Sequence, residues 1–177
     1  MEPPPAVRLP DDRARGDRGA PAALTIRDSG PHEAETHFAL QREASVGALA
    51  HIFPPAEFPY PDDEVRARWR GFGGRVLVAE RDDRPVGVAA IEGEWLHGLY
   101  VVPDEWGSGA GARLHDAAVE AIAAAHDEAK LWCLTENHRA RRFYERRGWR
   151  LNGDTRVVEY PPHPLDVGYS LALPRSA

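Results

Sequence analysis

The sequence predicts a single α/β domain with a mixed α+β sheet that is mostly antiparallel and contains one strand–helix–strand crossover. A length of 177 residues suits one hydrophobic core. Apolar residues alternate with a period of two in several short segments, and the period changes to 3.6 in one longer segment after Pro103. The expected order of elements is β-α-α-β-β-β-α-β-α-β-β.

The N-terminal segment differs in composition from the rest of the chain. Residues 1–21 contain five prolines and interleaved charges, with few apolar side chains. Such a segment buries too little apolar surface to fold. We therefore expect a disordered tail over residues 1–21 and one folded domain over residues 22–177.

The first half of this domain alternates strand and helix patterns. A strand is expected at residues 22–27, where apolar and polar residues alternate. Apolar spacing of three and four residues predicts a helix at 33–52, which Pro54 ends. Acidic residues begin a second, shorter helix at 62–70.

The middle of the chain combines a hairpin with a long helix. The β-rich runs 76–80 and 85–91 flank four polar residues, which is a hairpin pattern. A third β-rich run covers 95–102. The apolar stripe from Ala110 to Ala125 then has helical spacing and predicts an amphipathic helix.

The C-terminal part returns to strands around one helix. A strand is expected at 130–135 and a helix at 137–147, which Gly148 ends in the left-handed manner. The β-rich runs that supply the last strands are 149–151, 156–160 and 167–173.

Charge and cysteine content exclude several classes of protein. The chain has 22 Lys and Arg against 28 Asp and Glu, a formal charge of −6, so we expect no nucleic-acid partner. The one cysteine, Cys133, excludes an intramolecular disulfide and a thiolate zinc cluster, and no metal is expected. No apolar run reaches the ~20 residues that cross a bilayer, and no signal peptide pattern is present. We expect a cytoplasmic protein without a membrane partner.

A glycine-rich loop lies between the strand at 95–102 and the next helix. Without Cβ atoms, its backbone N–H groups can approach an anion, and the first turn of the helix adds free N–H groups. The loop therefore predicts a phosphate site, although a simple packing turn has the same composition. The loop residues are Trp106, Gly107, Ser108, Gly109, Ala110, Gly111 and Ala112.

The same loop also fits the spacing of the dinucleotide fingerprint, G-x-G-x-x-A. Four residues, 103–106, separate the strand from the first glycine. Only about 40 residues follow the next strand, too few for the remaining units of a doubly wound fold. We therefore disfavour a dinucleotide oxidoreductase.

A second motif begins the helix at 137–147. Asn137, Ala140 and Tyr144 share one helix face, and the small Ala140 leaves room for a ligand between the two polar ends. Phe143 and Tyr144 also suit a role as core aromatics. The arginines of this segment are expected mainly on a solvated surface.

These two motifs resemble those of the GNAT N-acetyltransferase superfamily. The loop is similar to the acyl-CoA loop of that superfamily, whose pattern is an Arg or Gln, two residues, Gly, one residue, and then Gly or Ala. In this chain Trp106 stands where the pattern has Arg or Gln. The segment 137–149 matches N-x-x-A-x-x-F-Y-E-x-x-G-F/W at every stated position. The resemblance covers residues 24–173 and implies a GNAT-like acyl-CoA N-acyltransferase fold.

The resemblance also implies acetyl-CoA as co-substrate and assigns roles to residues. Tyr144 would protonate the departing CoA thiolate, since a phenol near pKa 10 keeps its proton at neutral pH. The backbone of the strand, with the N–H of Val101 as a candidate, would polarise the acetyl carbonyl. The residues expected to contact the cofactor are Leu99, Tyr100, Val101, Trp106, Gly107, Ser108, Gly109, Ala110, Gly111, Ala112, Asn137, Phe143 and Tyr144.

A general base must also remove a proton from the acceptor amine. Relatives often carry a glutamate early in this strand, where ungapped alignment puts Trp95. A β-bulge would bring Glu94 into that position. His97 has the same strand parity as Trp95 and a suitable ordinary pKa near 6.5. The catalytic candidates are thus Tyr144 with Glu94 or His97, and a water chain is the third possibility for the base.

The acceptor is expected to be the primary amine of a small molecule, attacked directly in a ternary complex. Protein N-terminal acetyltransferases of the superfamily tend to place a glutamate where this chain has Trp132. A protein N-terminal or lysine acetyltransferase is the first alternative, and a non-catalytic acyl-CoA-binding module is the second. The oligomeric state is left open between monomer and homodimer.

The acceptor pocket is expected between residues 53–60 and 160–165. Aromatic side chains of these and nearby segments would line it, and acidic residues would attract a cationic amine. The aromatic candidates are Phe58, Tyr60, Trp95 and Trp132, and the acidic candidates are Glu57, Asp62 and Asp63.

Overall fold

A computed structural model describes residues 23–174 of the chain. The tail expected at 1–21 lies outside these residues. The strands are β1 (Leu24–Ser29), β2 (Arg75–Arg81), β3 (Arg84–Glu92), β4 (Trp95–Val101), β5 (Glu128–Leu134), β6 (Arg150–Val157) and β7 (Leu165–Ala172). The helices are α1 (Ala34–Val46), α2 (Asp62–Gly71), α3 (Ala110–Ala123) and α4 (His138–Glu145), with short 3-10 turns at Pro31–Glu33 and Pro103–Glu105.

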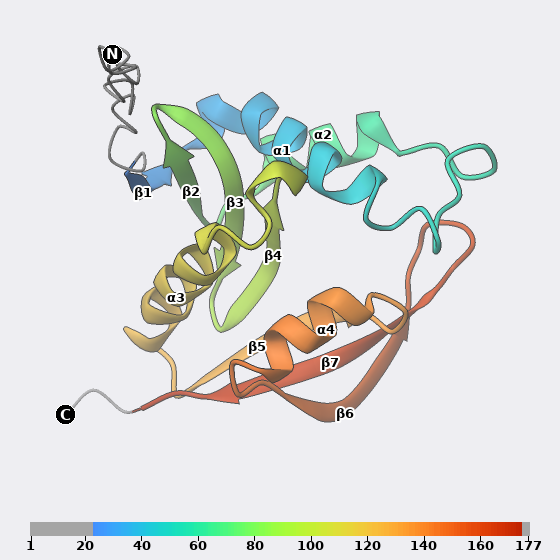
Figure 1. The fold of residues 1–177 in the computed structure, drawn as a ribbon. Coiled ribbons are helices and arrows are strands. Elements are labelled where there is room, and N and C mark those ends of the chain that lie inside the picture. Colours follow the sequence, from blue (N-terminus) through green and yellow to red (C-terminus); the bar gives the residue numbers. More distant parts are fainter. Residues whose placement is uncertain (1–22, 175–177) are drawn as a thin grey trace, which may run out of the picture.

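The strands form one seven-stranded sheet in the order β1-β2-β3-β4-β5-β7-β6. All neighbours are antiparallel except β4 and β5, which the helix α3 connects as a parallel crossover. This architecture confirms the expected mixed α/β fold. β4 and β5 pair only at Trp95 and Lys130 and then diverge, so the sheet is forked between them (Figure 1).

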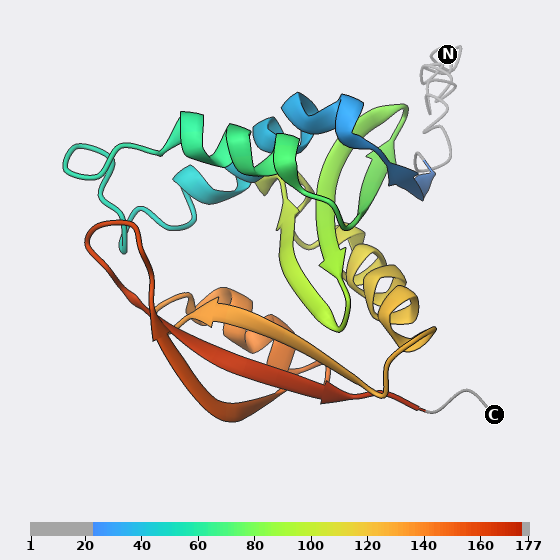
Figure 2. The ribbon, with the colours of Figure 1, turned by 180° about the vertical axis from the view of Figure 1, so that it is seen from behind.

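The helices cover both faces of the forked sheet. α1 and α2 lie on one face of β1–β4 and α3 lies on the other, whereas α4 packs against β5 and β7 (Figures 1 and 2). The apolar stripe of α3 is buried through Leu114, Ala118 and Ile122, as its helical spacing predicts. In the described part of the chain, no helix is both long and apolar enough to cross a membrane.

Two expected elements differ from the structure. The helix expected at 33–52 ends at Val46, and residues 47–52 continue as turns in which Leu49 N–H still bonds to the Ser45 carbonyl. The runs 149–151 and 156–160 contribute to one strand, β6, because an irregularity between Leu151 and Thr155 interrupts the alternation without ending the strand.

A buried histidine on α3 couples folding to pH. The Trp149 indole N–H donates to His115 Nε2 at 2.9 Å, so His115 Nδ1 carries the proton and donates to Asp116 at 2.8 Å. Burial lowers the pKa of His115 below its ordinary value near 6.5, and burial likewise lowers the pKa of His37. Protonation of His115 would remove the acceptor that Trp149 uses.

We expect stability to fall as the pH decreases below about 6.5, because the unfolded chain then binds protons that the folded histidines resist. This stability is fully present above the unfolded pKa and is lost as the pH falls toward the folded pKa. Melting temperatures at pH 7.5 and 5.5 measure the loss. The loss should be smaller in His115→Gln, and an equal loss in both proteins would contradict this account of His115.

Candidate active site

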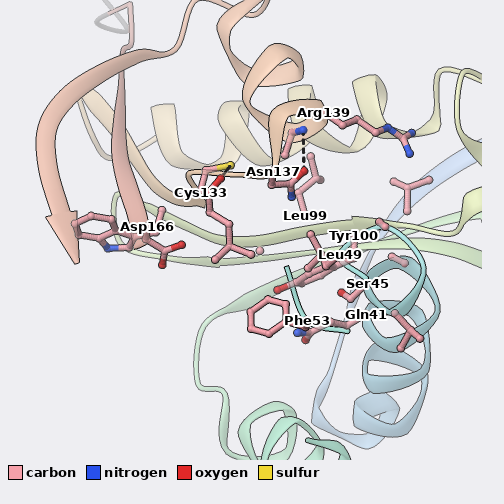
Figure 3. Close-up of a pocket in the computed structure, with 18 of the residues that line it drawn as sticks. Gln41, Ser45, Leu49, Phe53, Leu99, Tyr100, Cys133, Asn137, Arg139 and Asp166 are labelled. Carbon is pink, nitrogen blue, oxygen red and sulfur yellow. Dashed lines mark hydrogen bonds between the residues drawn. The ribbon is translucent and has the colours of Figure 1, made fainter. Parts of the chain in front are cut away.

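The fork between β4 and β5 opens into a cavity of about 1230 Å³. One side, which we call the α4 half, is lined by β4, the glycine loop at 106–112 and α4. The other side, the α1 half, is lined by α1, the loop between α1 and α2, and residues of β5 and β7. Figure 3 shows Asn137 and Arg139 on one side of Leu99, and Gln41, Ser45 and Leu49 on the other.

The glycine loop presents free backbone N–H groups to the α4 half. Within the described residues, the amides of Gly107, Gly109, Gly111 and Ala112 have no protein acceptor. The amides of Trp106, Ser108 and Ala110 are bonded within the loop instead, to the Pro103 carbonyl, the Glu105 carbonyl and the Ser108 hydroxyl. Gly107 and Gly109 have φ angles of 81° and 91°, a region that favours glycine. Four donors at the start of α3 thus suit an anion such as a diphosphate.

The edge of β4 is also unpaired with β5 where the fork opens, although its Val101 carbonyl accepts the Trp106 indole N–H. Val102 N–H bonds to the Val86 carbonyl at 3.0 Å, which fixes the alternation of the β3–β4 ladder. The backbone groups of Leu99 and Val101 therefore point away from β3, toward the fork, where β5 has already diverged. An extended, amide-containing ligand can pair there as an additional strand would.

Trp106 has a structural role in the loop. Its indole N–H donates to the Val101 carbonyl at 2.8 Å, and the Arg139 guanidinium lies 3.2 Å from the centroid of its ring. Position 106 has no basic side chain, and Arg139 of α4 supplies a positive charge at the loop instead. Arg139, Arg146 and Arg147 all line the cavity, and Arg139 and Arg146 are exposed, which agrees with the solvated surface expected from the sequence.

The α4 face meets the cavity through Asn137, Ala140, Phe143 and Tyr144. Asn137 Oδ1 accepts from Ala140 N–H at 3.2 Å and caps α4, which leaves its side-chain NH₂ group available. The Tyr144 side chain is buried, yet its hydroxyl bonds to no other described residue. Burial raises the pKa of Tyr144, and nearby Cys133 and Tyr100 raise it further, so the phenol holds its proton.

The two candidate bases lie in different places. A bulge interrupts the β3–β4 ladder with His97 as the extra residue, since Ile91 pairs with Leu96 and Ala90 pairs with Gly98. By simple alternation, Trp95, His97, Leu99 and Val101 would share one face of the strand, but the bulge moves Leu99 to the face opposite Trp95. His97 lines the cavity with its ring 5.7 Å from Phe72, and burial lowers its pKa.

Glu94 lies outside the lining of the cavity. It is at the turn between β3 and β4, where its carboxylate lies 3.6 Å from Lys130 Nζ. The β-bulge that would bring Glu94 toward the fork is located at His97 instead. Ser108 and Ala110 of the loop are also absent from the cavity lining.

Aromatic side chains line the α1 half, as the sequence indicates. The rings of Trp95 and Trp132 stack with centroids 6.0 Å apart, and the Arg156 guanidinium lies 4.6 Å from the centroid of the Trp132 ring. Phe58 and Tyr60 contribute from the loop between α1 and α2. These four aromatic residues thus form walls of the cavity.

The acidic residues of the α1 half differ from those expected. Glu57 lines the cavity, but Asp62 and Asp63 do not, because they pair with Arg42 and Arg66. Sequence reasoning missed Asp166, whose carboxylate lines the cavity, accepts one hydrogen bond of 2.9 Å from Arg156 Nε and forms an ion pair with the same guanidinium. Burial raises the pKa of Asp166. In the sequence, the only sign of this role was that Asp166 is a single acidic residue directly before the apolar strand pattern at 167–173.

A sheet forked beside a parallel crossover, with free amides at the helix start and a free strand edge, is the architecture of acyl-CoA N-acyltransferases. Residues 45–149 match the family described as Acetyltransferase (GNAT) family. The chain belongs to the GNAT acetyltransferase family.

Individual relatives agree with this assignment. An uncharacterized N-acetyltransferase of Archaeoglobus fulgidus is 38% identical over 81 residues, which are 39% of this chain and 55% of the relative. The match thus spans about half of that relative's length. A probable N-acetyltransferase of Mycobacterium tuberculosis is 27% identical over 154 residues, 76% of this chain and 84% of the relative.

A solved structure shares the fold. YncA from Salmonella typhimurium, a structure of a protein with its cofactor acetyl-CoA, has a TM-score of 0.64 and 16% identity, over 88% of this chain and 97% of that chain. At this identity the likeness shows the fold alone.

Proposed function

We propose that this protein transfers the acetyl group of acetyl-CoA to the primary amine of a small molecule, by direct attack in a ternary complex. The observation that carries the proposal is the continuity of the cavity. The free amides of the glycine loop and the free edge of β4 face the same space as the aromatic acceptor walls. One cavity is thus large enough for both reactants to meet.

The α4 half has the groups that acetyl-CoA requires. The amides of Gly107, Gly109, Gly111 and Ala112 would hold the diphosphate, and Arg139 lies beside them. The backbone of Leu99–Val101 would pair with the amides of the pantetheine arm, and the side chain of Asn137 would bond to the same region. Acetyl-CoA supplies the activated thioester in this arrangement.

The buried thiol of Cys133 favours direct transfer over an acyl-enzyme. Cys133 lines the cavity near Tyr144, where an acyl-enzyme nucleophile would need to be a thiolate. Burial raises the pKa of Cys133 to about 12, so the thiol stays protonated at neutral pH. The amine is then the nucleophile, Tyr144 protonates the departing thiolate, and Val101 N–H donates a hydrogen bond to the carbonyl oxygen as negative charge develops on it.

His97 is the proposed general base. A lysine-like amine costs about 4 kcal/mol to deprotonate at pH 7. His97 lies on the cavity wall, and its lowered pKa keeps the imidazole neutral and able to accept that proton.

We expect the wild type to lose activity below about pH 6.5, and we expect His97→Gln to lower kcat/KM by about 100-fold and to abolish that pH dependence. Steady-state kinetics from pH 5.5 to 9 measure both effects. Glu94→Gln is expected to leave the pH profile unchanged, since Glu94 pairs with Lys130 outside the cavity. A changed profile in Glu94→Gln alone would transfer the role to Glu94, and no change in either variant would leave a water chain as the base.

The surroundings of the α1 half favour a small acceptor. The α1–α2 loop and the β6–β7 loop approach each other at the open end of the fork (Figures 1 and 2). His51 Nε2 also bonds to the Glu136 carbonyl at 3.0 Å, which ties the α1 side to the start of α4. An entering polypeptide would have to separate these segments.

The proposal is tested by free-thiol release from acetyl-CoA in the presence of separate amine and peptide libraries. We expect turnover with small primary amines and little with peptides. Efficient acetylation of peptides would instead favour a protein acetyltransferase. Acetyl-CoA binding without turnover on any amine would favour a non-catalytic module.

A further inference from the structure

A group of unpartnered hydrogen-bond donors lies on the α1 half of the cavity. The group contains two hydroxyls of tyrosine, one of serine, one carboxamide and one guanidinium, which we call the donor cluster. Its members are Gln41, Ser45, Tyr60, Arg68 and Tyr100, and all line the cavity. Figure 3 shows Gln41 and Ser45 in sequence along α1, beneath Tyr100.

The buried members of the cluster are held in place but not satisfied. Gln41, 7% exposed, uses its carbonyl oxygen to accept from the Trp69 indole at 2.8 Å, which leaves its NH₂ group free. Ser45, 8% exposed, has the Tyr60 hydroxyl as its side-chain neighbour. The Tyr60 hydroxyl is fully buried, and no group of the described residues meets it with the geometry of a hydrogen bond, although the Ser45 hydroxyl lies near it. Unpaired buried polar groups are costly, so this arrangement indicates a ligand that pairs with them.

Arg68 adds a positive charge at the same place. Its guanidinium interacts electrostatically with both Tyr60 and Tyr100, and it forms no ion pair with a described carboxylate. The other charged side chains that line this half are Glu57, Glu64, Arg156 and Asp166. Arg156 and Asp166 neutralise each other. The two glutamates are exposed and form no ion pair within the described residues. Glu64 lies one helical turn before Arg68 on α2, whereas Glu57 belongs to the α1–α2 loop.

We infer that the acceptor is a primary amine that also carries a carboxylate, and that the donor cluster binds this carboxylate. A carboxylate only accepts hydrogen bonds, which suits a cluster of free donors around a guanidinium. The amine of such a molecule would be directed away from the donor cluster, toward the fork. This inference rests on the proposed acetyl transfer and specifies its acceptor.

The test compares matched acceptors and one charge-removing variant. The probes are L-amino acids with apolar and aromatic side chains, their carboxamides, and the corresponding amines that lack the carboxylate. We expect the amino acids to have at least 10-fold higher kcat/KM than their two analogues. Arg68→Gln should lower kcat/KM for the amino acids by about 10- to 100-fold and leave the value for the carboxamides unchanged.

Two controls separate this inference from the proposed function. Arg70→Gln removes an exposed arginine of the same helix that pairs with Glu35 outside the cavity, and it should leave both activities unchanged. Calorimetric binding of acetyl-CoA should be the same in Arg68→Gln and the wild type. Turnover with equal kcat/KM for amino acids and carboxamides would overturn the inference and leave acetyl transfer standing. An equal loss for both kinds of probe in Arg68→Gln would also overturn it, and failure of the wild type to bind acetyl-CoA would overturn both.

Discussion

Substitution of Gly111 by aspartate is expected to weaken acetyl-CoA binding at least 100-fold while leaving the protein folded. Gly111 is in the first turn of α3, and its amide is one of the four free donors. An added Cβ would lie 3.7 Å from both Phe143 and Val101, an ordinary van der Waals contact, so the side chain can be accommodated. The new carboxylate would occupy the anion site and repel a diphosphate.

The same substitution should not lower stability. A carboxylate in the first turn of a helix interacts favourably with the helix dipole by about 0.3–1 kcal/mol. We therefore expect an unchanged or higher melting temperature together with the loss of binding measured by titration calorimetry. Gly111→Asn, nearly the same shape without the charge, should lose much less affinity. Equal affinities in the aspartate variant and the wild type would contradict the placement of the diphosphate.

Replacement of Tyr144 by phenylalanine is expected to lower kcat by about 100- to 10,000-fold, the usual contribution of a general acid. The phenol lines the cavity without a hydrogen-bond partner among the described residues, and its raised pKa keeps it protonated. The change removes one hydroxyl and none of the ring contacts with Phe143 and Trp149. The dissociation constant for acetyl-CoA should therefore stay within about twofold.

Tyr169 provides the matched control for this substitution. Its hydroxyl bonds to Arg141 and Glu145 behind α4, outside the cavity. Tyr169→Phe should cost about 1 kcal/mol of stability and leave kcat nearly unchanged. Similar kcat values for Tyr144→Phe and the wild type would mean that the leaving thiolate takes its proton from another source.

Local patterns in the sequence were sufficient for most of the fold. The change of period after Pro103 predicts both the end of β4 and the helix α3, and the left-handed Gly148 follows α4 as expected. The end of α1 was wrong by six residues, because residues 47–52 keep helix-like bonds in a looser arrangement that has the same apolar spacing.

The parts of the site that depend on non-local contacts were not predictable in the same way. The bulge at His97 is a property of the pairing of β4 with β3, and it changes which residues face the fork. Asp166 meets the cavity only because β7 lies beside β5. The partner of Asp62, Arg42, comes from α1, so the charge of Asp62 appeared available in the sequence although the fold pairs it. Asp63 pairs locally with Arg66, three residues further along α2.

The most direct test of the account is an amide NMR titration of ¹⁵N-labelled protein with coenzyme A. We expect large, saturable shifts for the amide signals of Gly107, Gly109, Gly111 and Ala112, because these four groups would donate to the diphosphate. Signals of the loop amides that already have protein acceptors, such as Ser108, should move less. Binding that leaves the four free amides unperturbed would contradict the claim on which the proposed chemistry depends.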